Sequence, residues 1–430
     1  PALPRGRGER RDTRRIPVVG AGQSGLQPAL GLLAEGYEVS LVSATGPQEI
    51  RTGRVMSTQC LFGPALRRER RHGLALWDDR APAIRGVSVR VADAGGDRAS
   101  DLSWAGSLEE PAQSVDQRIK MSAWLELFAR SGGVLVRHRV REQDLDRFAS
   151  DHDLVVIAAG RGELAELFPR DTRRSHFRSP QRRLALAYVT GAVPHPDGSV
   201  LSRTVIPGAG EVLTLPTYSL AGVCEAVLVE AVPGGPLERP LPADASAEEV
   251  LAGVLDVLRS EAPWEYERLA HTRLADPGAT LHGGYTPVVR EPVARLADGT
   301  PVLGMADSVV ANDPIVAQGA NMASFCAEVY RRAIVDHGTR PFDESFMRAA
   351  FADYWRQASQ VTAWGRVLLD NPPYVQELYR LASWHKETAD RFANSFGDPS
   401  DLIEWFLHPE RALAYVDGVL RSRSSHPRTC

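Results

Sequence analysis

The decapeptide IPVVGAGQSG, which begins at Ile16, decides the fold class of this chain. A short apolar run leads into Gly20, Gly22 and Gly25 in the spacing G-x-G-x-x-G, which is typical of the turn between the first strand and the first helix of a dinucleotide-binding unit. A side chain at Gly20 or Gly22 would hold a pyrophosphate away from the backbone amides, and Gly25 lets the helix lie close to the strand. The sequence therefore predicts a nucleotide site at the start of the chain.

The helix and the strand that follow complete the predicted βαβ unit. Gln23 and Ser24 open a helix whose first amides face the phosphates, and a second strand follows at residues 37–42. Most sites of this kind end the second strand with a carboxylate that binds the ribose hydroxyls, whereas this strand leads into Ser43. We therefore expect a nucleotide that is held more weakly than usual.

The bulk composition favours small-molecule chemistry. The 430 residues are 43% hydrophobic and 24% charged, with a formal net charge of -4, so no positive field would gather nucleic acid or anionic lipid. No apolar run is long enough to span a bilayer, and residues 1–15 lack the apolar region of a signal peptide, so we expect a disordered leader there. The cysteines lie far apart, without metal-ligand spacing, which predicts no metal site and a reduced, cytoplasmic setting; they are Cys60, Cys224, Cys326 and Cys430.

A second segment, residues 301–321 (PVLGMADSVVANDPIVAQGAN), decides which nucleotide is bound. Residues 301–304 predict a strand that runs into Asp307, whose carboxylate can accept hydrogen bonds from a ribityl chain. Residues 318–321 open a helix whose N-terminal amides can stabilise negative charge on a flavin ring. Taken alone, Asp307 is more typical of a helix cap or a turn. The combination of both features favours FAD.

These patterns carry a family resemblance that covers most of the chain. The early G-x-G-x-x-G, a late Gly-x-x-Asp that ends at Asp307 and a Pro-x-x-x-Gln-Gly-x-Asn that begins at Pro314 resemble the flavin-binding fold of p-hydroxybenzoate hydroxylase and its relatives. The chain resembles more closely the oxygenase component of styrene monooxygenase and indole monooxygenase. Four stretches carry this closer resemblance: TGRVMST (52–58), VDQRIKM (115–121), NDPIVAQGAN (312–321) and FANSFGDPSDLIEWFLHPERALAYV (392–416).

The resemblance implies an α/β fold with three parts. These are a Rossmann-type, glutathione-reductase-like FAD-binding domain, an inserted and mainly β substrate-binding domain, and a helical C-terminal region. The residues themselves predict short strands between 164 and 290 and helices after Asp343. The expected boundaries are 16–50, 112–165 and 291–336 for the FAD-binding domain, 51–111 and 166–290 for the substrate-binding domain, and 337–430 for the helical region.

The resemblance also implies an activity. A two-component FAD-dependent monooxygenase takes reduced FAD from a separate NADH-dependent flavin reductase, and that flavin reacts with O₂ to form a C4a-hydroperoxyflavin. The electrophilic oxygen is then transferred to an aromatic alkene or an indole-type substrate, which is epoxidised or hydroxylated. Such a site must exclude water, so we expect an apolar substrate pocket. The implied partners are the aromatic substrate and the reductase, with no nucleic acid and no membrane, and a homodimer is a further expectation.

The resemblance assigns roles to individual residues. Ser57, Thr58 and Asn321 are the expected catalytic residues, and Ser57 stands where the family commonly has Asn. Arg54 and Arg118 resemble arginines that neutralise phosphate in the family, although in a chain this rich in arginine each is otherwise a surface residue. The expected flavin-binding residues are Gly20, Gly22, Gln23, Ser24, Gly25, Ser43, Arg54, Arg118, Ala159, Gly160, Gly304, Asp307, Pro314, Gln318, Gly319, Ala320 and Asn321.

One departure from the family separates the alternatives. A buried strand is expected at residues 153–160, and single-component aromatic hydroxylases end the equivalent strand with Asp-Gly, a site associated with cofactor and NADPH contacts. Here Ala159 and Gly160 lead into Arg161 and Gly162 instead, which puts direct use of NAD(P)H in doubt. The alternatives are a single-component NAD(P)H-dependent aromatic hydroxylase and, from a different class, a flavoprotein that only binds or shuttles flavin.

Overall fold

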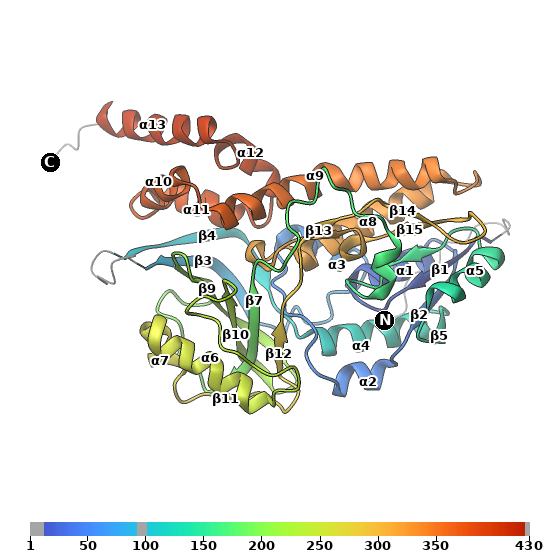
Figure 1. Cartoon of the computed structure of the whole chain (residues 1–430), viewed down its shortest axis with the longest axis horizontal. Helices are drawn as coiled ribbons and strands as arrows, with labels where there is room; N and C mark the ends of the chain where they lie inside the picture. The colour runs from blue at the N-terminus through green and yellow to red at the C-terminus, as the bar shows by residue number, and fades with distance from the viewer. Residues whose placement is uncertain (1–12, 93–100, 426–430) are drawn as a thin grey trace.

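Two sheets and their covering helices build the protein, whose computed structural model describes residues 13–92 and 101–425 (Figure 1). The first sheet has six strands in the order β14-β15-β6-β1-β2-β5. Five of them run parallel, and β14 pairs antiparallel with β15. The strands of this sheet are β1 (Arg15–Val19), β2 (Glu38–Ser43), β5 (Val134–Arg137), β6 (Val156–Ile157), β14 (Val293–Arg295) and β15 (Pro301–Gly304).

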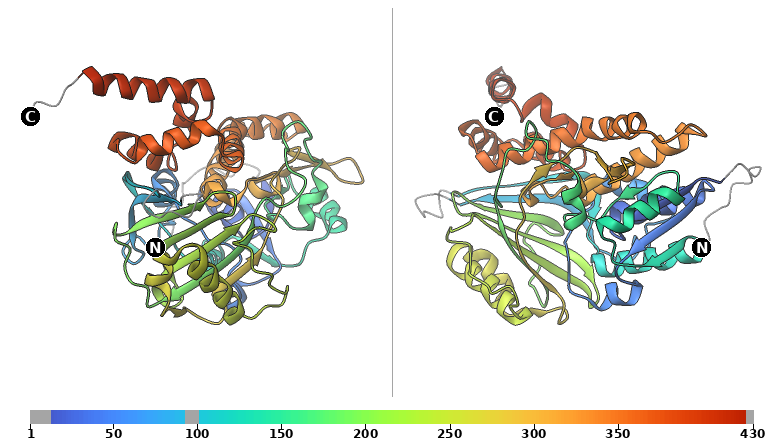
Figure 2. Two further views of the ribbon diagram at one scale, coloured as in Figure 1. Left: turned by 60° about the vertical axis from the view of Figure 1, so that its left-hand side comes forward. Right: turned by 45° about the vertical axis from the view of Figure 1, so that its right-hand side comes forward.

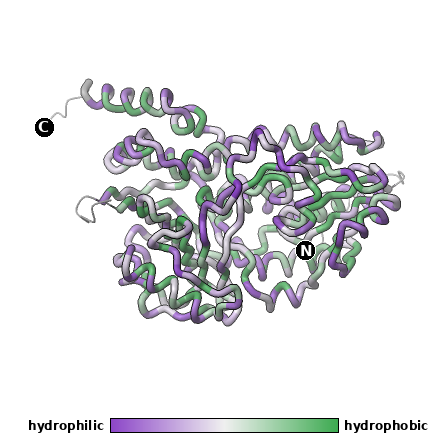
Figure 3. The backbone as a smooth tube through the Cα atoms, viewed as in Figure 1, coloured by the Kyte–Doolittle hydropathy of each residue, from purple (hydrophilic) through white to green (hydrophobic). Residues whose placement is uncertain are grey.

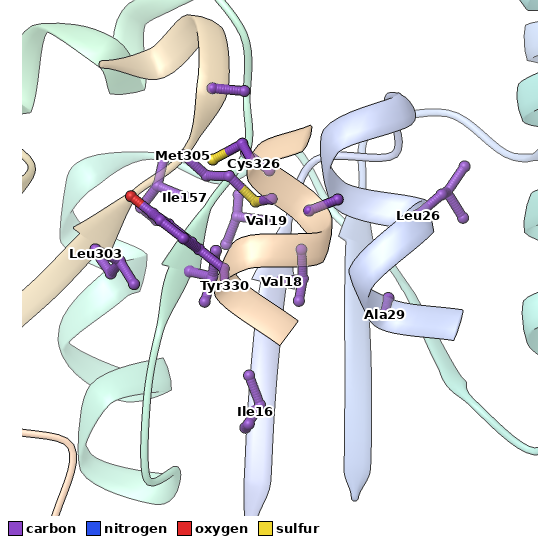
Figure 4. Close-up of a cluster of buried hydrophobic side chains, with 14 of the residues drawn as sticks. Ile16, Val18, Val19, Leu26, Ala29, Ile157, Leu303, Met305, Cys326 and Tyr330 are labelled. Carbon is purple, nitrogen blue, oxygen red and sulfur yellow. The ribbon is translucent and has the colours of Figure 1, made fainter. Parts of the chain in front are cut away.

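Helices cover this parallel sheet because its strands are apolar on both faces. Between β1 and β2 runs α1 (Gln23–Ala34), which packs against α8 (Gly319–His337). Figure 4 shows the shared core, in which Leu26 of α1 and Cys326 and Tyr330 of α8 are buried with Val18 of β1. Full burial of a large apolar side chain contributes about 1.5–3 kcal/mol, so this core fixes how the starts of α1 and α8 lie relative to β1.

Further helices and turns connect or flank these strands. They are α2 (Pro47–Thr52), α3 (Gly63–Arg71), α4 (Gln117–Arg130), α5 (Glu142–Asp151), the 3-10 turns η2 (Glu163–Leu167), η3 (Ala306–Ser308) and η4 (Pro314–Val316), and the short paired strands β13 (Val288–Val289) and β16 (Val310–Ala311).

The second sheet has eight strands in the order β11-β7-β10-β9-β8-β3-β4, with β12 paired to β7. Its ladders are antiparallel except for β3 and β8, which run parallel. The strands are β3 (Ala83–Val91), β4 (Leu102–Gln113), β7 (Arg183–Thr190), β8 (Val200–Ile206), β9 (Gly210–Ser219), β10 (Gly222–Ala231), β11 (Arg273–Leu274) and β12 (Thr280–Gly283).

The two faces of the second sheet pack against different helices, as Figure 2 shows from two sides. Alternate residues point to opposite faces of a strand. On β7, Ala187 belongs to the core shared with α6 (Ala247–Glu261) and α7 (Pro263–Leu269), whereas Leu186 and Tyr188 belong to the core on the other side. That other side faces the C-terminal helices and is called the inner face below.

C-terminal helices cover the inner face, where two of them contact β4 and the last packs on its helical neighbours, and Figure 3 shows them alternating apolar and polar residues along the chain. Asp343 begins the first of them by accepting a hydrogen bond from the amide of Phe346. Aromatic side chains fill the contact with the sheet; the ring of Trp104 on β4 meets that of Phe392 edge-on at 5.0 Å. The helices are α9 (Glu344–Asp370), α10 (Pro373–Ala382), α11 (Lys386–Asn394), α12 (Leu402–Trp405) and α13 (Pro409–Ser425), with the turn η5 (Pro399–Asp401).

The predicted fold class is confirmed, but the length of one predicted strand is wrong. The strand expected at residues 153–160 is only two residues long. This strand, β6, pairs with β1 and β15 at Val156 and Ile157, and the chain leaves the sheet after Ile157. Helix α4 begins at Gln117, because the Asp116 carboxylate caps it by accepting from the amide of Arg118.

The expected leader, residues 1–15, was given an end that lies too far along the chain. Residues 1–12 and Cys430 lie outside the described residues, but Arg15 already belongs to β1, and its amide donates to the Asp153 carboxylate at 2.8 Å. Within the described ranges, no helix has the length and apolar character needed to cross a membrane. Within the same ranges, no three His, Cys, Asp or Glu side chains gather into a group that could hold a metal ion.

Candidate flavin site

The three glycines of the N-terminal loop are required for different reasons. Gly20 has φ +124°, and a Cβ there would lie 2.2 Å from the carbonyl oxygen of Ala158. A Cβ at Gly25 would lie 2.0 Å from the carbonyl oxygen of Gly20. Gly20 and Gly25 are therefore needed for backbone packing, which corrects the expectation that a side chain at Gly20 would chiefly obstruct a phosphate. Only Gly22 has open space around its Cβ position, with nothing within 4 Å.

The open space beside Gly22 lies at the positive end of a helix. Gly22 is the N-cap of α1, and the first turn of this helix contains no acidic residue. Ser24 is partly exposed at this end. A helix N-terminus with no competing carboxylate in its first turn favours a bound anion. This geometry fits a pyrophosphate beside Gly22.

A buried polar group that the sequence analysis missed fixes the same helix end. Gln23 donates to the Glu69 carboxylate of α3 at 3.3 Å, and the Lys120 ammonium of α4 lies 2.5 Å from the same carboxylate oxygen. Burial raises the pKa of Glu69 and lowers that of Lys120, and their mutual attraction opposes both shifts. The signal was present in the sequence, since Lys120 and Lys386 are the only lysines of a chain rich in arginine.

Asp307 lies in η3 after β15, a strand that only β6 separates from β1 in the parallel sheet. Its carboxylate is paired with the guanidinium of Arg161 at 3.3 Å, and both side chains are about one third exposed, at 33% and 38%. Gly304 precedes this turn and cannot carry a side chain, because its Cβ would lie 2.8 Å from the Phe168 ring. Ser308 donates to the carbonyl of Gly160 at 3.1 Å, which ties the segment to the loop after β6. Asp307 is thus accessible beside Ala159 and Gly160.

The segment that carries the late part of the resemblance contains strained backbone. Among the described residues, three non-glycine residues have positive φ, and two of them, Ala306 and Ala317, lie in this segment at φ +48° and +51°. The left-handed conformation costs a non-glycine residue roughly 1–2 kcal/mol, and strain of this kind gathers at binding sites. Ala317 ends η4, which begins at Pro314, and directs the chain into α8.

The start of α8 combines an open surface with an unpartnered polar atom. Gln318 is buried and donates to the carbonyl of Phe396 at 2.9 Å, but its Oε1 atom has no partner among the described residues. Gly319 is exposed, with nothing within 4 Å of its Cβ position. Ala320 is half-buried beside Leu66 of α3. A planar ring system has room at Gly319 and could satisfy the buried Gln318 oxygen.

Asn321 is a positioning residue in this structure. Its side-chain amide donates to the carbonyl of Cys60 at 2.9 Å, and its side-chain oxygen accepts from the amide of Phe62 at 3.0 Å. Both ends of the amide are therefore used to hold the loop after Thr58 against α8. The expectation of a catalytic Asn321 is replaced by this role, because catalysis requires a group that touches the reactants.

Thr58 connects the same loop to the inner face of the second sheet. The Tyr188 hydroxyl of β7 donates to the Thr58 hydroxyl at 3.2 Å, and Tyr188 is fully buried. Ser57 is half-buried beside it, whereas the neighbouring Met56 is 75% exposed. Tyr188 has no sequence signal of its own, because only the fold brings β7 to this loop.

Three other expected residues have surroundings that bear on their roles. Arg118 is buried, and its guanidinium donates to the carboxylates of Asp116 and Asp276, each at distances down to 2.6–2.7 Å. It is thus neutralised by protein carboxylates in this structure, contrary to the expectation that it faces a phosphate. Arg54 is exposed. The Ser43 hydroxyl donates to the carbonyl of Thr45 at 2.7 Å and is therefore a turn residue at the end of β2.

The inner face of the second sheet is apolar near Thr58 and charged farther away. Leu186, Leu215 and Ala226 are buried there. Toward the end of β10 lies Glu230, which is fully buried and has no hydrogen-bond partner for either carboxylate oxygen within the described ranges. Burial raises the pKa of Glu230 well above its ordinary value, and the neighbouring Glu211 and Asp313 carboxylates raise it further. The apolar part of the inner face thus has a polar border.

Taken together, these residues fit FAD. Gly22 at the α1 N-terminus has room for the pyrophosphate, Asp307 is accessible for a ribityl chain, and Gly319 and Gln318 offer room and an unpartnered oxygen for the ring. Gly22 and Asp307 follow the carboxyl ends of the parallel strands β1 and β15, where ligands bind in open α/β sheets, and Gly319 begins α8, which packs against α1.

Comparisons with known proteins agree with this assignment. Residues 160–268 match the family profile described as "Styrene monooxygenase A putative substrate binding domain". The chain is 28% identical over 407 residues to styrene monooxygenase StyA of Pseudomonas fluorescens, covering 93% of this chain and 96% of that relative. Over the same coverage it is 27% identical to styrene monooxygenase StyA of Pseudomonas sp..

Solved structures with the same fold include a flavoprotein, a flavin-dependent brominase and an oxygenase. A flavoprotein/dehydrogenase from Cytophaga hutchinsonii has a TM-score of 0.63 at 14% identity, covering 89% of this chain and 92% of its own. The flavin-dependent brominase Bmp2 has a TM-score of 0.60 at 14% identity, with 90% and 99% covered. The tetrameric form of 2-methyl-3-hydroxypyridine-5-carboxylic acid oxygenase has a TM-score of 0.58 at 17% identity, with 91% and 98% covered.

At these identities the structural likeness establishes the fold, and the sequence matches along nearly the whole chain narrow the type of enzyme. The family profile on residues 160–268 and the two curated relatives agree on that type, and the site geometry has room for the cofactor that it uses. This chain is a flavin-dependent monooxygenase, and along nearly its whole length it is similar to styrene monooxygenases.

Proposed function

We propose that the protein takes reduced FAD from a separate NADH-dependent reductase and uses it with O₂ to epoxidise an aromatic alkene or to oxidise an indole-type substrate. One observation carries the two-component part of this proposal. Ser43 stands at the end of β2, where a carboxylate would bind the ribose, and its hydroxyl is engaged with the Thr45 carbonyl. Without that carboxylate, FAD is held more loosely and can exchange with a reductase.

The same residues that fit FAD would hold it during the reaction. Backbone amides at Gly22 and at the start of α8 would bind the pyrophosphate and the flavin ring, and Asp307 would accept from the ribityl chain. When bound and reduced, the flavin supplies the activation of O₂. The division of the chain into FAD-binding, substrate-binding and helical parts at the expected boundaries belongs to this proposal.

The protein's own contribution is to exclude water and to orient the substrate. The substrate ring would lie beside the loop that holds Ser57 and Thr58, where Leu186 and Leu215 make the inner face apolar. The Tyr188 hydroxyl fixes the Thr58 hydroxyl, so that one polar group would be held against the substrate edge. A neutral aromatic alkene needs no charged partner, which agrees with the pairing of Arg118 to two carboxylates.

A panel of substrates tests this proposal. The purified protein, with FAD, NADH and a free flavin reductase of another origin, is incubated with styrene, indole and benzoate as a charged control. The proposal expects styrene oxide or indigo, with no hydroxylated benzoate. Product that forms with NADH and no reductase would instead support the single-component hydroxylase, and the lack of any product would leave a protein that only binds flavin.

A further inference from the structure

Arg161 lies beside the nucleotide loop, although no role in flavin binding was expected for it. It follows β6, and the loop after β6 touches the N-terminal glycine loop, because the Cβ position of Gly20 lies 2.2 Å from the Ala158 carbonyl oxygen and 3.0 Å from the Ala159 amide nitrogen. Gly160, with φ +66°, then turns the chain toward Asp307. Arg161 thus stands between the expected pyrophosphate site and the expected ribityl site.

The side chain of Arg161 has two partners. Its guanidinium lies 3.3 Å from the Asp307 carboxylate and 3.7 Å from the centre of the Tyr285 ring. Tyr285 donates in turn to the carbonyl of Asn312 at 2.6 Å. The guanidinium therefore lies on an aromatic platform beside a carboxylate, and it is 38% exposed, so that it can be reached by a ligand.

The charges at this site favour a change of partner for the Arg161 guanidinium when FAD binds. FAD brings two phosphate charges to the glycine loop, close to the carboxylate of Asp307. Burial raises the pKa of Asp307, and the neighbouring Arg161 lowers it. A guanidinium binds phosphate with parallel hydrogen bonds, and a stacked arginine keeps its forked geometry while it changes partner. A carboxylate paired with arginine also has fewer free acceptor positions for ribityl hydroxyls.

We propose that Arg161 is a flavin-positioning residue that pairs with Asp307 in the free protein and with the FAD pyrophosphate in the bound one. The exchange frees the Asp307 carboxylate for the ribityl chain and places a cation on the phosphates. This inference deepens the proposed function and rests on it, because it assumes that FAD occupies the site. It also gives a second reason why flavin exchanges readily, since the Asp307 pair must break each time FAD enters and reforms when FAD leaves.

The test measures equilibrium binding without substrate, reductase or turnover. Oxidised FAD and riboflavin are titrated by flavin fluorescence, and ADP is titrated by displacement of FAD. ADP carries the pyrophosphate without the ribityl chain, and riboflavin carries the ribityl chain without phosphate. The variants are Arg161→Ala, Arg161→Lys and Asp307→Asn. Arg90→Ala is the matched control, since Arg90 also pairs with a carboxylate, Asp101, and stacks on a ring, Trp264, but lies on β3.

The proposal expects Arg161→Ala to weaken FAD and ADP binding by about tenfold to a hundredfold, the range for one charge-assisted pair. Riboflavin affinity should not fall in Arg161→Ala. Arg161→Lys should recover part of the ADP affinity, because the charge remains while the fork is lost. Asp307→Asn should weaken FAD and riboflavin but should not weaken ADP, because the Arg161 guanidinium no longer has to leave a carboxylate to reach the pyrophosphate. Arg90→Ala should bind all three ligands like the unaltered protein.

Three outcomes would overturn the proposal. If Arg161→Ala weakens riboflavin but not ADP, Arg161 acts only by orienting Asp307. If Arg161→Ala leaves FAD affinity unchanged or increases it, the guanidinium does not bind the pyrophosphate and only competes with the ribityl chain for Asp307. If ADP does not displace FAD from the unaltered protein, the pyrophosphate site itself is absent. A failure of oxygen transfer would affect none of these binding results, so the two proposals can fail separately.

Discussion

The hydroxyl of Tyr188 donates a hydrogen bond to the hydroxyl of Thr58 across 3.2 Å, and this bond joins the second sheet to the loop beside the flavin site. Burial raises the pKa of Tyr188, so its hydroxyl stays protonated as a donor. The bond links a residue that the resemblance places in catalysis to a strand that was predicted only as part of a sheet. The hydrogen bond therefore connects the second sheet to the candidate flavin site through two uncharged hydroxyl groups.

Tyr188→Phe removes this bond without removing the ring. We expect the free energy of unfolding to fall by about 0.5–1.5 kcal/mol, the net value of one hydrogen bond. Thr58→Val removes the other partner, and the double variant should cost less than the sum of the two single variants, because both lose the same bond. Urea unfolding of all four proteins measures this coupling. Strictly additive losses would mean that the two hydroxyls do not interact in solution.

The glycine loop gives a matched pair of variants. Gly22→Val should fold and lose FAD binding, because its side chain would enter the open space assigned to the pyrophosphate. Gly20→Ala should fail to fold well, because its Cβ would collide with the Ala158 backbone at φ +124°. Circular dichroism and FAD fluorescence titration separate the two effects. Normal FAD affinity in folded Gly22→Val would refute the location of the site.

The buried Glu69–Lys120 pair should matter for stability more than for chemistry. Lys120→Met leaves a buried carboxylate without its cation, and we expect a loss of about 3–5 kcal/mol in the free energy of unfolding. The double variant Lys120→Met with Glu69→Leu removes both charges and should recover most of that loss. Chemical denaturation tests both variants. A single variant as stable as the unaltered protein would show that the pair is neutral or hydrated in solution.

Asp313 should make stability depend on pH. Burial raises the pKa of its carboxyl group to about 6, with the Ile315 amide and Arg182 opposing the shift and Glu211 adding to it. A carboxyl group whose folded pKa is raised stabilises the fold fully below its unfolded value, near 3.8, and this contribution is lost as pH rises through about 6. The total change is on the order of 3 kcal/mol.

Asp313→Asn keeps the acceptor for the Ile315 amide and cannot ionise. The unaltered protein should therefore lose stability relative to Asp313→Asn as the pH rises from about 4 to 6. Urea unfolding of both proteins across this range measures it. A difference that stays constant with pH would mean that Asp313 is solvated or already paired.

The sequence was sufficient for the features that depend on local spacing. The G-x-G-x-x-G loop, the strand at Pro301–Gly304 and the helix that begins at Gly319 were all predicted where they occur, because turns and helix starts impose their own residue types. The fold class and the flavin chemistry followed from these features together with the resemblance.

Contacts between residues far apart in the chain could not be predicted from the sequence. Tyr188 and Thr58 are 130 residues apart, and Asn321 bonds to Cys60 over 261 residues, so only the packing of α8 and β7 brings them together. Without those contacts Asn321 had been assigned to catalysis. Arg118 was assigned to a phosphate for the same reason, because the Asp276 carboxylate that engages it lies 158 residues away.

The proposed function requires that this protein transfers oxygen with reduced FAD that it does not itself reduce. The most direct measurement is a single turnover in which the protein is mixed anaerobically with chemically reduced FAD and styrene or indole, and then with isotopically labelled O₂. The account predicts styrene oxide or an oxidised indole that carries one labelled oxygen atom, formed with no NADH or NADPH present. Product that appears only when NADPH is added to the protein, with no reductase in the mixture, would contradict it.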